Sequence, residues 1–314
     1  MKKNYLSELA KPVFVLTVIL SFVFSGCQQP PKADETVKID INAVGEPISP
    51  YIYGQFIEHL GKCIYGGIWA EMLEDRKFYY PVTFEFNPWG TSTDPQWNTG
   101  EYKFLNASPW QVIGDEKTVS MDKKSPYVGE QTPVVKLKGD GSAAGIKQAG
   151  IEFLAGKEYT GRIILAGDAS AAPVTVQITS ENNESVKVEI AEISSEFKSY
   201  PLSFTTPFAG KNCAVEIVSA GKGSFKIGTV SLMPADNING WRPDVVALLK
   251  ELNSPVYRWP GGNFVSGYNW RDGIGEMDNR PPRKNQAWKG VENNDVGLHE
   301  YMMLMEIIDD EPFV

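Results

Sequence analysis

The middle of the chain is built from short stretches in which hydrophobic and polar residues alternate. Gly, Asn, Ser and Pro separate these stretches, and such residues favour turns. No long amphipathic helix interrupts the pattern, so it predicts an all-β module of the jelly-roll or sandwich type, inserted at residues 84–235. The predicted strands are 134–138, 160–166, 174–179, 186–190, 200–205, 214–218 and 225–232.

The flanks of this module have a different pattern. Before it, the alternating residues 37–41 and the apolar residues 51–57 predict strands, and residues 68–76 predict a short helix. After it, apolar residues spaced three and four apart follow Pro243 and Gly297, which predicts two helices. Further strands are predicted at 256–259 and from 312 onward.

Alternating strands and helices are typical of a β/α barrel, which needs about 250 residues for its eight units. Too few residues lie outside the inserted module to close one. The predicted fold class is therefore α/β plus all-β: an incomplete (β/α)8 barrel, represented by its first two to three strands. We expect residues 37–83 to form its first part and residues 236–314 its continuation, truncated within a strand.

The N-terminus has the pattern of an export signal. Basic residues precede an apolar run at 13–24, which is too short for a comfortable transmembrane helix. Phe24-Ser-Gly-Cys27 then resembles a bacterial lipoprotein cleavage box. We expect residues 1–26 to be a signal peptide, Cys27 to carry lipid and the polar residues 27–36 to be a tether. The protein would then be anchored to the bacterial envelope on its periplasmic or cell-surface side; the alternative is a plain secretory signal or an uncleaved anchor.

Composition narrows the classes of partner. Thirty Lys and Arg against 39 Asp and Glu give a net charge of −9, which argues against a nucleic-acid partner and favours a neutral ligand. Two histidines, His59 and His299, cannot build a multi-histidine metal site. Cys63 and Cys213 fall in different predicted domains and outside any CxxC motif, so we expect two unpaired thiols.

Two motifs carry candidate chemistry. Glu58 and His59 end the first predicted barrel strand, and Arg258 lies on the next one, which runs into Pro-Gly-Gly-Asn263. The carboxyl ends of barrel strands form the rim that holds active sites. A carboxylate and an amide there can bond several sugar hydroxyls, and we expect Arg258 to point inward. The simpler alternatives are a capping or surface-paired Glu58, an ordinary turn at Gly261-Gly262, and a structural His59.

Together with residues 66–71, 268–273, Trp288 and Glu292-Asn293, these motifs resemble the N-terminal half of the family 51 glycoside hydrolases, the α-L-arabinofuranosidases. The resemblance covers roughly residues 39–85 and 241–314. It implies retaining hydrolysis of terminal α-L-arabinofuranosyl groups from an arabinose-containing polysaccharide or oligosaccharide, without metal or cofactor, and an oligomer is possible for the full-length family. It implies substrate-binding roles for Glu58, Arg258, Asn263 and Trp288, and it makes the inserted module similar to a carbohydrate-binding domain.

The resemblance also implies that both catalytic carboxylates are missing from the chain. The acid/base Glu of the family ends the fourth barrel strand and its nucleophile ends the seventh, so both would lie beyond residue 314. We therefore expect this chain alone to be inactive. One hypothesis is the front part of an arabinofuranosidase; the alternative is a non-catalytic glycan-binding surface lipoprotein. In either case the candidate exposed aromatic residues of the module are Trp89, Trp97 and Trp110.

Overall fold

The computed structural model describes residues 37–84, 87–91 and 103–314, and the chain divides between Ile48 and Ser49 into two compact units. In the first unit, residues 37–48 are exposed throughout and contain a turn in which the Asp40 carboxylate accepts the Asn42 N–H at 2.9 Å. The strand predicted at 37–41 is therefore wrong. Its alternating side chains have no sheet to pack on within the described residues, and alternation alone does not make a strand.

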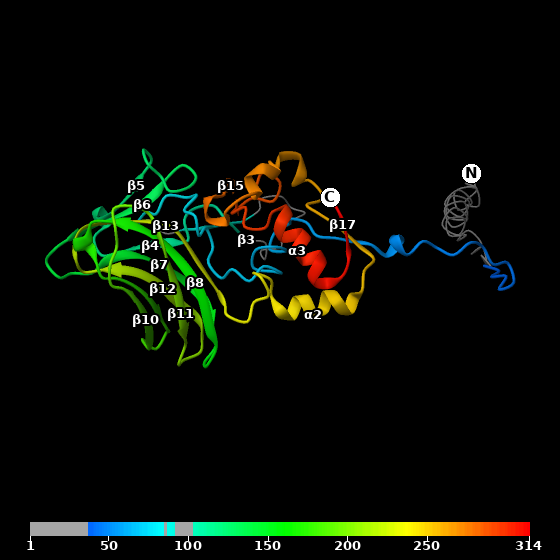
Figure 1. Ribbon diagram of the computed structural model, residues 1–314, viewed down its shortest axis with the longest axis horizontal. Coiled ribbons are helices and arrows are strands. Elements are labelled where there is room, and N and C mark those ends of the chain that lie inside the picture. The colour runs from blue at the N-terminus through cyan, green and yellow to red at the C-terminus, as the bar shows by residue number, and fades with distance from the viewer. Residues whose placement is uncertain (1–36, 85–86, 92–102) are drawn as a thin grey trace, which may run out of the picture. The chain divides into compact units, whose positions relative to one another are not determined.

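Two five-stranded antiparallel sheets face each other in the second unit (Figure 1). In spatial order, one contains β10 (Ser185–Ile190), β9 (Val174–Thr179), β12 (Gly210–Ser219), β7 (Ala144–Phe153) and β4 (Trp110–Ile113). The other contains β11 (Lys198–Thr205), β8 (Glu158–Gly167), β13 (Lys222–Pro234), β6 (Thr132–Lys138) and β5 (Val119–Asp122). Every strand predicted in this region is confirmed, whereas β4, β5 and β7 were not predicted.

Alternation of side chains builds one core between these sheets. Along β9, Val174, Val176 and Ile178 are buried while the residues between them are half-buried. The inward side chains of both sheets join a single hydrophobic cluster, which also takes in Leu73 and Phe78 from the segment before the module. This is the layered packing expected for two sheets with one apolar face each.

A three-stranded parallel sheet follows the order β1 (Gln55–Phe56), β14 (Val256–Arg258) and β17 (Glu311–Phe313). The helices α2 (Pro243–Leu252) and α3 (Leu298–Ile308) begin where they were predicted and separate these strands in the sequence. Short antiparallel pairs, β2 (Trp89–Thr91) with β3 (Lys103–Leu105) and β15 (Arg283–Lys284) with β16 (Val291–Glu292), complete the strands. The described residues form no closed barrel.

Single turns of 3₁₀ helix occupy several connections. One of them, η1 (Pro50–Tyr53), replaces the start of the strand predicted at 51–57, where Pro50 favours the first position of a helical turn. The others are η2 (Glu116–Thr118), η3 (Ala169–Ala171), η4 (Val265–Gly267), η5 (Trp270–Gly273) and η6 (Met277–Asn279).

The helix predicted at residues 68–76 is wrong. The backbone N–H of Ala70 donates to the Gly240 carbonyl at 2.8 Å, and that of Met72 donates to the Leu232 carbonyl at 3.0 Å. The Glu71 carboxylate accepts the N–H groups of Leu73 and Leu232, both at 3.0 Å. Because these tertiary partners take up the backbone hydrogen-bonding groups, the segment follows β13 without forming a helix and turns at residues 74–77.

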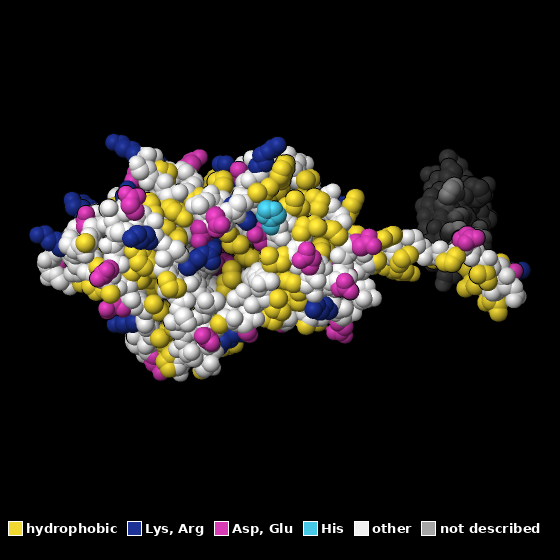
Figure 2. All heavy atoms as spheres, viewed as in Figure 1, with side chains coloured by type: hydrophobic (Ala, Val, Ile, Leu, Met, Phe, Trp, Pro, Cys, Tyr) yellow, Lys and Arg dark blue, Asp and Glu magenta, His cyan; other side chains and the backbone are white. Residues whose placement is uncertain are grey.

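A second hydrophobic cluster lies under the parallel sheet. Trp69 and Trp241 meet edge to face with ring centroids 4.9 Å apart, and Trp259 stacks on Tyr301 at 5.4 Å. Beyond it, Figure 2 shows hydrophobic side chains gathered over α2 and α3, and Leu248 and Leu252 there are more than half exposed. No helix in the described ranges is long and apolar enough to cross a membrane, and the apolar run at 13–24 lies outside those ranges.

Candidate functional site

Glu58 is a buried carboxylate at the carboxyl end of β1. Only 8% of the residue is exposed, and within the described part of the chain its side chain has no hydrogen-bond or ion-pair partner. Burying a carboxylate without a partner is costly unless water or a ligand satisfies it. The neighbouring residue Cys63 is exposed, and its thiol is unpaired, as predicted. Partial burial of this thiol raises its pKa.

The Gly261-Gly262 turn after β14 leaves room for this carboxylate. Both glycines have positive φ, 72° and 50°, which L side chains rarely adopt. A Cβ placed on Gly262 would lie 1.3 Å from Oε1 of Glu58. The Pro-Gly-Gly-Asn sequence therefore positions the carboxylate as well as turning the chain.

The ring of His59 makes two hydrogen bonds, accepting one and donating the other. The indole N–H of Trp259 can only donate, and it reaches Nε2 of His59 at 3.1 Å. Nε2 is therefore the acceptor, and Nδ1 donates to Glu292 Oε2 at 2.7 Å. The ring also stacks on Phe264 at 4.4 Å between centroids. His59 is thus a satisfied, neutral histidine that orients Glu292.

Glu292 is itself fully engaged. Its Oε1 accepts the Tyr65 hydroxyl and the Asn294 N–H, and the residue is 3% exposed. Burial, together with the nearby carboxylates of Glu292 and Asp295, raises the pKa of Tyr65 well above its usual value. Tyr65 therefore stays a hydroxyl donor to Glu292.

Asn263 is exposed and lines a cavity of about 470 Å³ beside the aromatic rings of Phe264 and Tyr268. Amide, carboxylate and aromatic groups combine there, with Glu292 and Asn294 on the wall. Such a surface can hydrogen-bond polar hydroxyls while rings cover apolar faces of a ligand. Glu58 does not line this cavity but lies behind the adjoining glycine turn.

Arg258 differs from expectation because it is exposed. Strand alternation buries Tyr257 and sends Arg258 to the opposite face, beside Phe56 and Phe313 in register. Its guanidinium lies over the Phe56 ring at 5.0 Å, and both of these neighbours are exposed by more than half. No described element covers this face, and Arg258 has no ion pair among the described residues. Its Nη2 would lie 3.6 Å from a Cβ on Gly261, on the same turn that Glu58 contacts.

The predicted aromatic residues are not gathered in one place. Trp288 is half-buried and lines a second, narrower cleft with Trp89 and Phe104, and this cleft shares Asn285 and Glu292 with the Asn263 cavity. Trp110 is 1% exposed, so the prediction that this ring is exposed is wrong. Its indole N–H donates to the Asp75 carbonyl at 3.2 Å. Trp89 is 41% exposed, and Trp97 lies outside the described residues.

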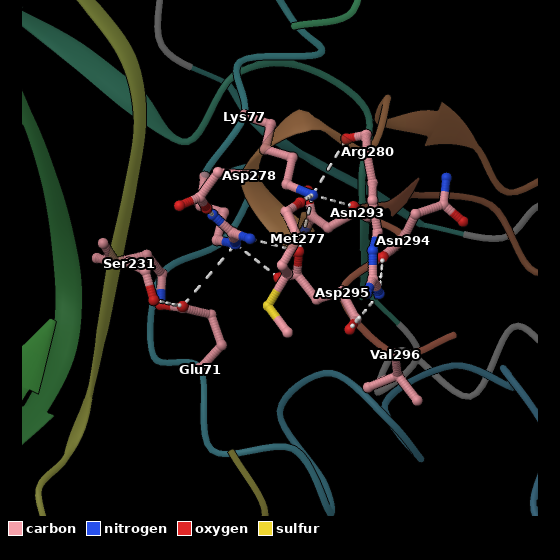
Figure 3. A network of polar contacts seen from close by, with 12 residues as sticks. Glu71, Lys77, Ser231, Met277, Asp278, Arg280, Asn293, Asn294, Asp295 and Val296 are labelled. Atoms are coloured by element: carbon pink, nitrogen blue, oxygen red, sulfur yellow. Dashed lines mark hydrogen bonds and ion pairs between the residues drawn. The ribbon is translucent and has the colours of Figure 1, made fainter. Parts of the chain in front are cut away.

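A buried ionic network was not predicted (Figure 3). Arg76 donates to both oxygens of Asp295, at 2.5 and 2.6 Å, and to Asp278 at 2.7 Å. The Lys77 ammonium lies 2.9 Å from Asp295 and donates to the carbonyls of Met277, Arg280 and Asn293. The available signal was the charged run Glu74-Asp75-Arg76-Lys77, which stands between Met72-Leu73 and the aromatic residues 78–80.

Burial and charge oppose each other in this network. Burial lowers the pKa of Lys77 to about 8, although Asp295 pulls it upward. Arg76 and Lys77 hold the pKa of Asp295 below its usual value despite burial. The ion pairs of Arg76 and Lys77 with Asp278 and Asp295 therefore act as a salt-bridged anchor. Within the described ranges, no group of three His, Cys, Asp or Glu side chains is arranged to hold a metal ion.

Comparison with known proteins identifies one part of the chain strongly. Residues 248–314 match the family model described as "Alpha-L-arabinofuranosidase 1 domain". A probable α-L-arabinofuranosidase C of Aspergillus clavatus is 49% identical over 80 residues, which are 26% of this chain and 16% of that protein. An intracellular exo-α-L-arabinofuranosidase of Bacteroides ovatus is 46% identical over 93 residues, covering 29% of this chain and 18% of that protein.

The fold is similar over a larger part of the chain. A solved arabinose-bound MgGH51 α-L-arabinofuranosidase matches with a TM-score of 0.63 and 19% identity, over 82% of this chain and 43% of that one. The mostly β architecture with few helices is thus shared with a family 51 enzyme. The chain spans less than half of the length of that solved enzyme, and its matched segments span under one fifth of the curated relatives.

Proposed function

We propose that this chain is the substrate-binding front of a retaining α-L-arabinofuranosidase that releases terminal α-L-arabinofuranosyl groups from an arabinose-containing polysaccharide. The observation that carries the proposal is Glu58, a buried carboxylate with no partner among the described residues, set against the Gly261-Gly262 turn at the ends of two paired parallel strands. The match of residues 248–314 to an arabinofuranosidase domain supports the same reaction class.

Each residue would have a limited role in this proposal. Glu58 would accept hydrogen bonds from sugar hydroxyls, which compensates the cost of its burial. Asn263 would donate and accept at the rim of the adjoining cavity, and Arg258, beside the same turn, would contribute a positive charge. Gly262 would let the sugar and the carboxylate approach without a side chain between them.

Chemistry needs two further carboxylates. Retention requires an acid/base and a nucleophile about 5–5.5 Å apart. Glu292 is a poor candidate because His59, Tyr65 and the Asn294 N–H occupy its oxygens. We therefore assign both catalytic groups to sequence that would follow residue 314, as the family resemblance implies.

The finer fold assignment belongs to the same proposal. The parallel order β1-β14-β17, with helices between successive strands, supports the opening of a (β/α)8 barrel. The two antiparallel sheets between β1 and α2 support an inserted jelly-roll-like module at 84–235. A separate hydrophobic cluster under each part supports two structural domains.

The test of function compares two polypeptides. The 314-residue chain should not turn over an aryl α-L-arabinofuranoside. The same chain extended by the C-terminal part of the Bacteroides ovatus relative should do so, and Glu58→Gln should lower its kcat/KM by about 100-fold or more, as expected when a transition-state hydrogen bond is lost. Turnover by the short chain would contradict this assignment of the catalytic groups, and turnover by neither would favour a non-catalytic glycan-binding lipoprotein.

We also propose that Cys27 is lipidated and anchors the protein to the bacterial envelope. The basic residues, the apolar run and the Phe24-Ser-Gly-Cys27 sequence support this assignment. Wild-type protein should be labelled metabolically by palmitate and recovered with membranes, and Cys27→Ala should lose both properties. Soluble, unlabelled wild-type protein would contradict lipidation.

A further inference from the structure

Two clefts beside the Asn263 cavity share a wall with each other, and the narrower one also shares Asn285 and Glu292 with that cavity. Trp89, Lys62 and Glu74 line the narrow cleft that contains Trp288, and the same three residues line a cavity of about 610 Å³ at the edge of the antiparallel sheets. Residues of β7 and the turn after it, including Glu152 and Leu154, form the far side of that cavity. The narrow cleft and the larger cavity are therefore neighbours that share the exposed indole of Trp89.

We propose that these clefts form one groove that binds an uncharged polysaccharide main chain, with Trp89 as the platform on which a sugar ring stacks. The inference rests on the proposed function for the identity of the polysaccharide, an arabinose-bearing hemicellulose. It adds a binding site, outside the Glu58 site, that reaches the antiparallel sheets.

Trp89 has the properties of such a platform. It is 41% exposed, although it borders two cavities, and flat indole rings bind the apolar faces of sugars. The Lys62 ammonium lies 5.5 Å from its ring centroid, and this ammonium also pairs with Glu74 at 3.5 Å. The cation–π contact and the ion pair limit the motion of the ring and of the lysine beside it.

The floor of the groove is fixed before any ligand binds. Gln148 of β7 is 3% exposed, and its side chain accepts the Glu74 N–H at 2.9 Å and donates to the Glu74 carbonyl at 2.8 Å. This paired contact ties β7 to the segment that carries Glu74. A preformed surface loses less entropy when a ligand binds, as a weakly interacting neutral chain requires.

The charges along the groove favour an uncharged ligand. Three of the four Lys and Arg side chains that line the clefts have an acidic neighbour, and the fourth, Lys289, has no ion pair among the described residues. The clefts therefore offer a polyanion no cluster of unneutralised positive charge. The pairs are Lys62 with Glu74, Lys157 with Asp236 at 3.1 Å, and Arg242 with Asp244 at 2.6 Å. The exposed carboxylate of Glu152 has no partner among the described residues and can accept sugar hydroxyls.

Affinity electrophoresis of the 314-residue chain in gels containing arabinoxylan tests the groove. Trp89→Ala should weaken retardation by about tenfold in apparent Kd, the effect of losing one stacking contact worth about 1.4 kcal/mol. Trp89→Phe should restore much of it. The matched control is Trp270→Ala, because Trp270 is 49% exposed, has Arg271 over its ring at 4.7 Å and lines neither cleft.

Unchanged retardation of Trp89→Ala, or an equal loss in Trp270→Ala, would overturn the proposal. So would tighter binding to polygalacturonate, a polyanion, than to arabinoxylan. Thermal unfolding of each variant separates lost binding from lost folding, and Trp89→Phe keeps the test valid if the alanine variant unfolds. In the extended enzyme, Trp89→Ala should leave hydrolysis of a one-sugar aryl substrate intact, so failure of the groove and failure of the hydrolase assignment give different results.

Discussion

At the residue scale, the candidate site depends on how closely a backbone can approach a carboxylate. Glu58 is buried against Gly262, where a Cβ would lie 1.3 Å from Oε1 and 2.3 Å from Cδ. A carboxyl group whose place is set by packing, with no protein hydrogen bond among the described residues, keeps its lone pairs for a ligand. The glycine is therefore as much a part of the site as the glutamate.

Gly262→Ala should displace Glu58 and also strain the turn, since φ is +50°. In the extended enzyme, kcat/KM for an aryl arabinofuranoside should fall by about 100-fold or more, as for a 1 Å misplacement of a positioned group. Gly45→Ala is the control, because Gly45 is exposed, does not line the Asn263 cavity and has nothing within 4 Å of its Cβ position. Equal activities of the two variants would mean that Glu58 has no positioning role.

Asp75 should make folding stability depend on pH. Burial raises its pKa from 3.8 to about 8, although it accepts the N–H groups of Tyr79 and Tyr80. Between these pH values the folded state holds a proton that the unfolded state has released, so stability falls as pH rises, by up to about 1.4 kcal/mol per pH unit. Urea unfolding at pH 5 and 7.5 measures this slope.

Asp75→Asn should remove that part of the slope, even if the variant is less stable overall. Asp140→Asn is the control, because Asp140 is exposed and hydrogen bonds from Ser142 lower its pKa. Its titration therefore affects folding stability only in more acidic solution. A wild-type slope that persists in Asp75→Asn would show that another group titrates.

At the scale of elements, the hydrophobic pattern predicted what local periodicity controls. The strands β8 to β13 and the helices α2 and α3 lie where alternation and helical spacing place them. The ten-residue strand β7 was not predicted because two glycines interrupt its alternation, and Gly145 is required there because a Cβ would lie 1.9 Å from the Ile217 carbonyl oxygen of β12. The segment 68–76 follows its tertiary partners and not its own pattern.

The candidate site, too, could be predicted only where local sequence patterns determine it. Strand ends correctly placed Glu58 beside the glycine turn before Asn263, since both strands are parallel neighbours. The sequence could not show that Arg258 would be exposed, because strand alternation gives two faces without saying which one is covered. Nor could it show that Trp288 would join Trp89 in a different cleft, because contacts between residues almost 200 positions apart follow from the fold alone.

The hydroxyl of Tyr301 links the helix α3 to two strands of the parallel sheet. Tyr301, 1% exposed, donates to the Tyr257 carbonyl of β14 and accepts the Phe313 N–H of β17 at 3.2 Å. Tyr301→Phe leaves the buried Tyr257 carbonyl and the Phe313 N–H without this partner and should cost about 1–3 kcal/mol in urea unfolding. Tyr53→Phe should have no measurable effect, because that ring is 63% exposed and its hydroxyl has no hydrogen bond within the described part of the chain. Similar losses for both would contradict the attachment.

At the scale of the molecule, two hydrophobic cores are joined by polar contacts. One cluster fills the space between the antiparallel sheets, and the other lies under β14 and α3. Asp278, in the loop between α2 and α3, accepts Arg162 of β8 at 2.5 and 3.0 Å and Arg76 at 2.7 Å, while Ser231 of β13 donates to Glu71 at 2.6 Å. The two arginines hold the pKa of Asp278 well below its usual value.

Removing Asp278 should uncouple the two cores. Breaking a buried ion pair from one side costs about 3–5 kcal/mol, and here Asp295 would be left to balance the buried charges of both Arg76 and Lys77. The antiparallel sheets keep their own core, so Asp278→Ala should lower the stability of the parallel sheet and its helices first. Limited proteolysis during a thermal ramp should then cut within residues 236–314 well before it cuts within the sheets, whereas in the wild type both regions should become susceptible together.

Asp236→Ala breaks an exposed pair with Lys157 and should behave like the wild type, because such pairs contribute about 1 kcal/mol or less. Simultaneous loss of both regions in Asp278→Ala would show that the apolar contacts near Trp69 and Met233, and not the ionic network, make the molecule cooperative.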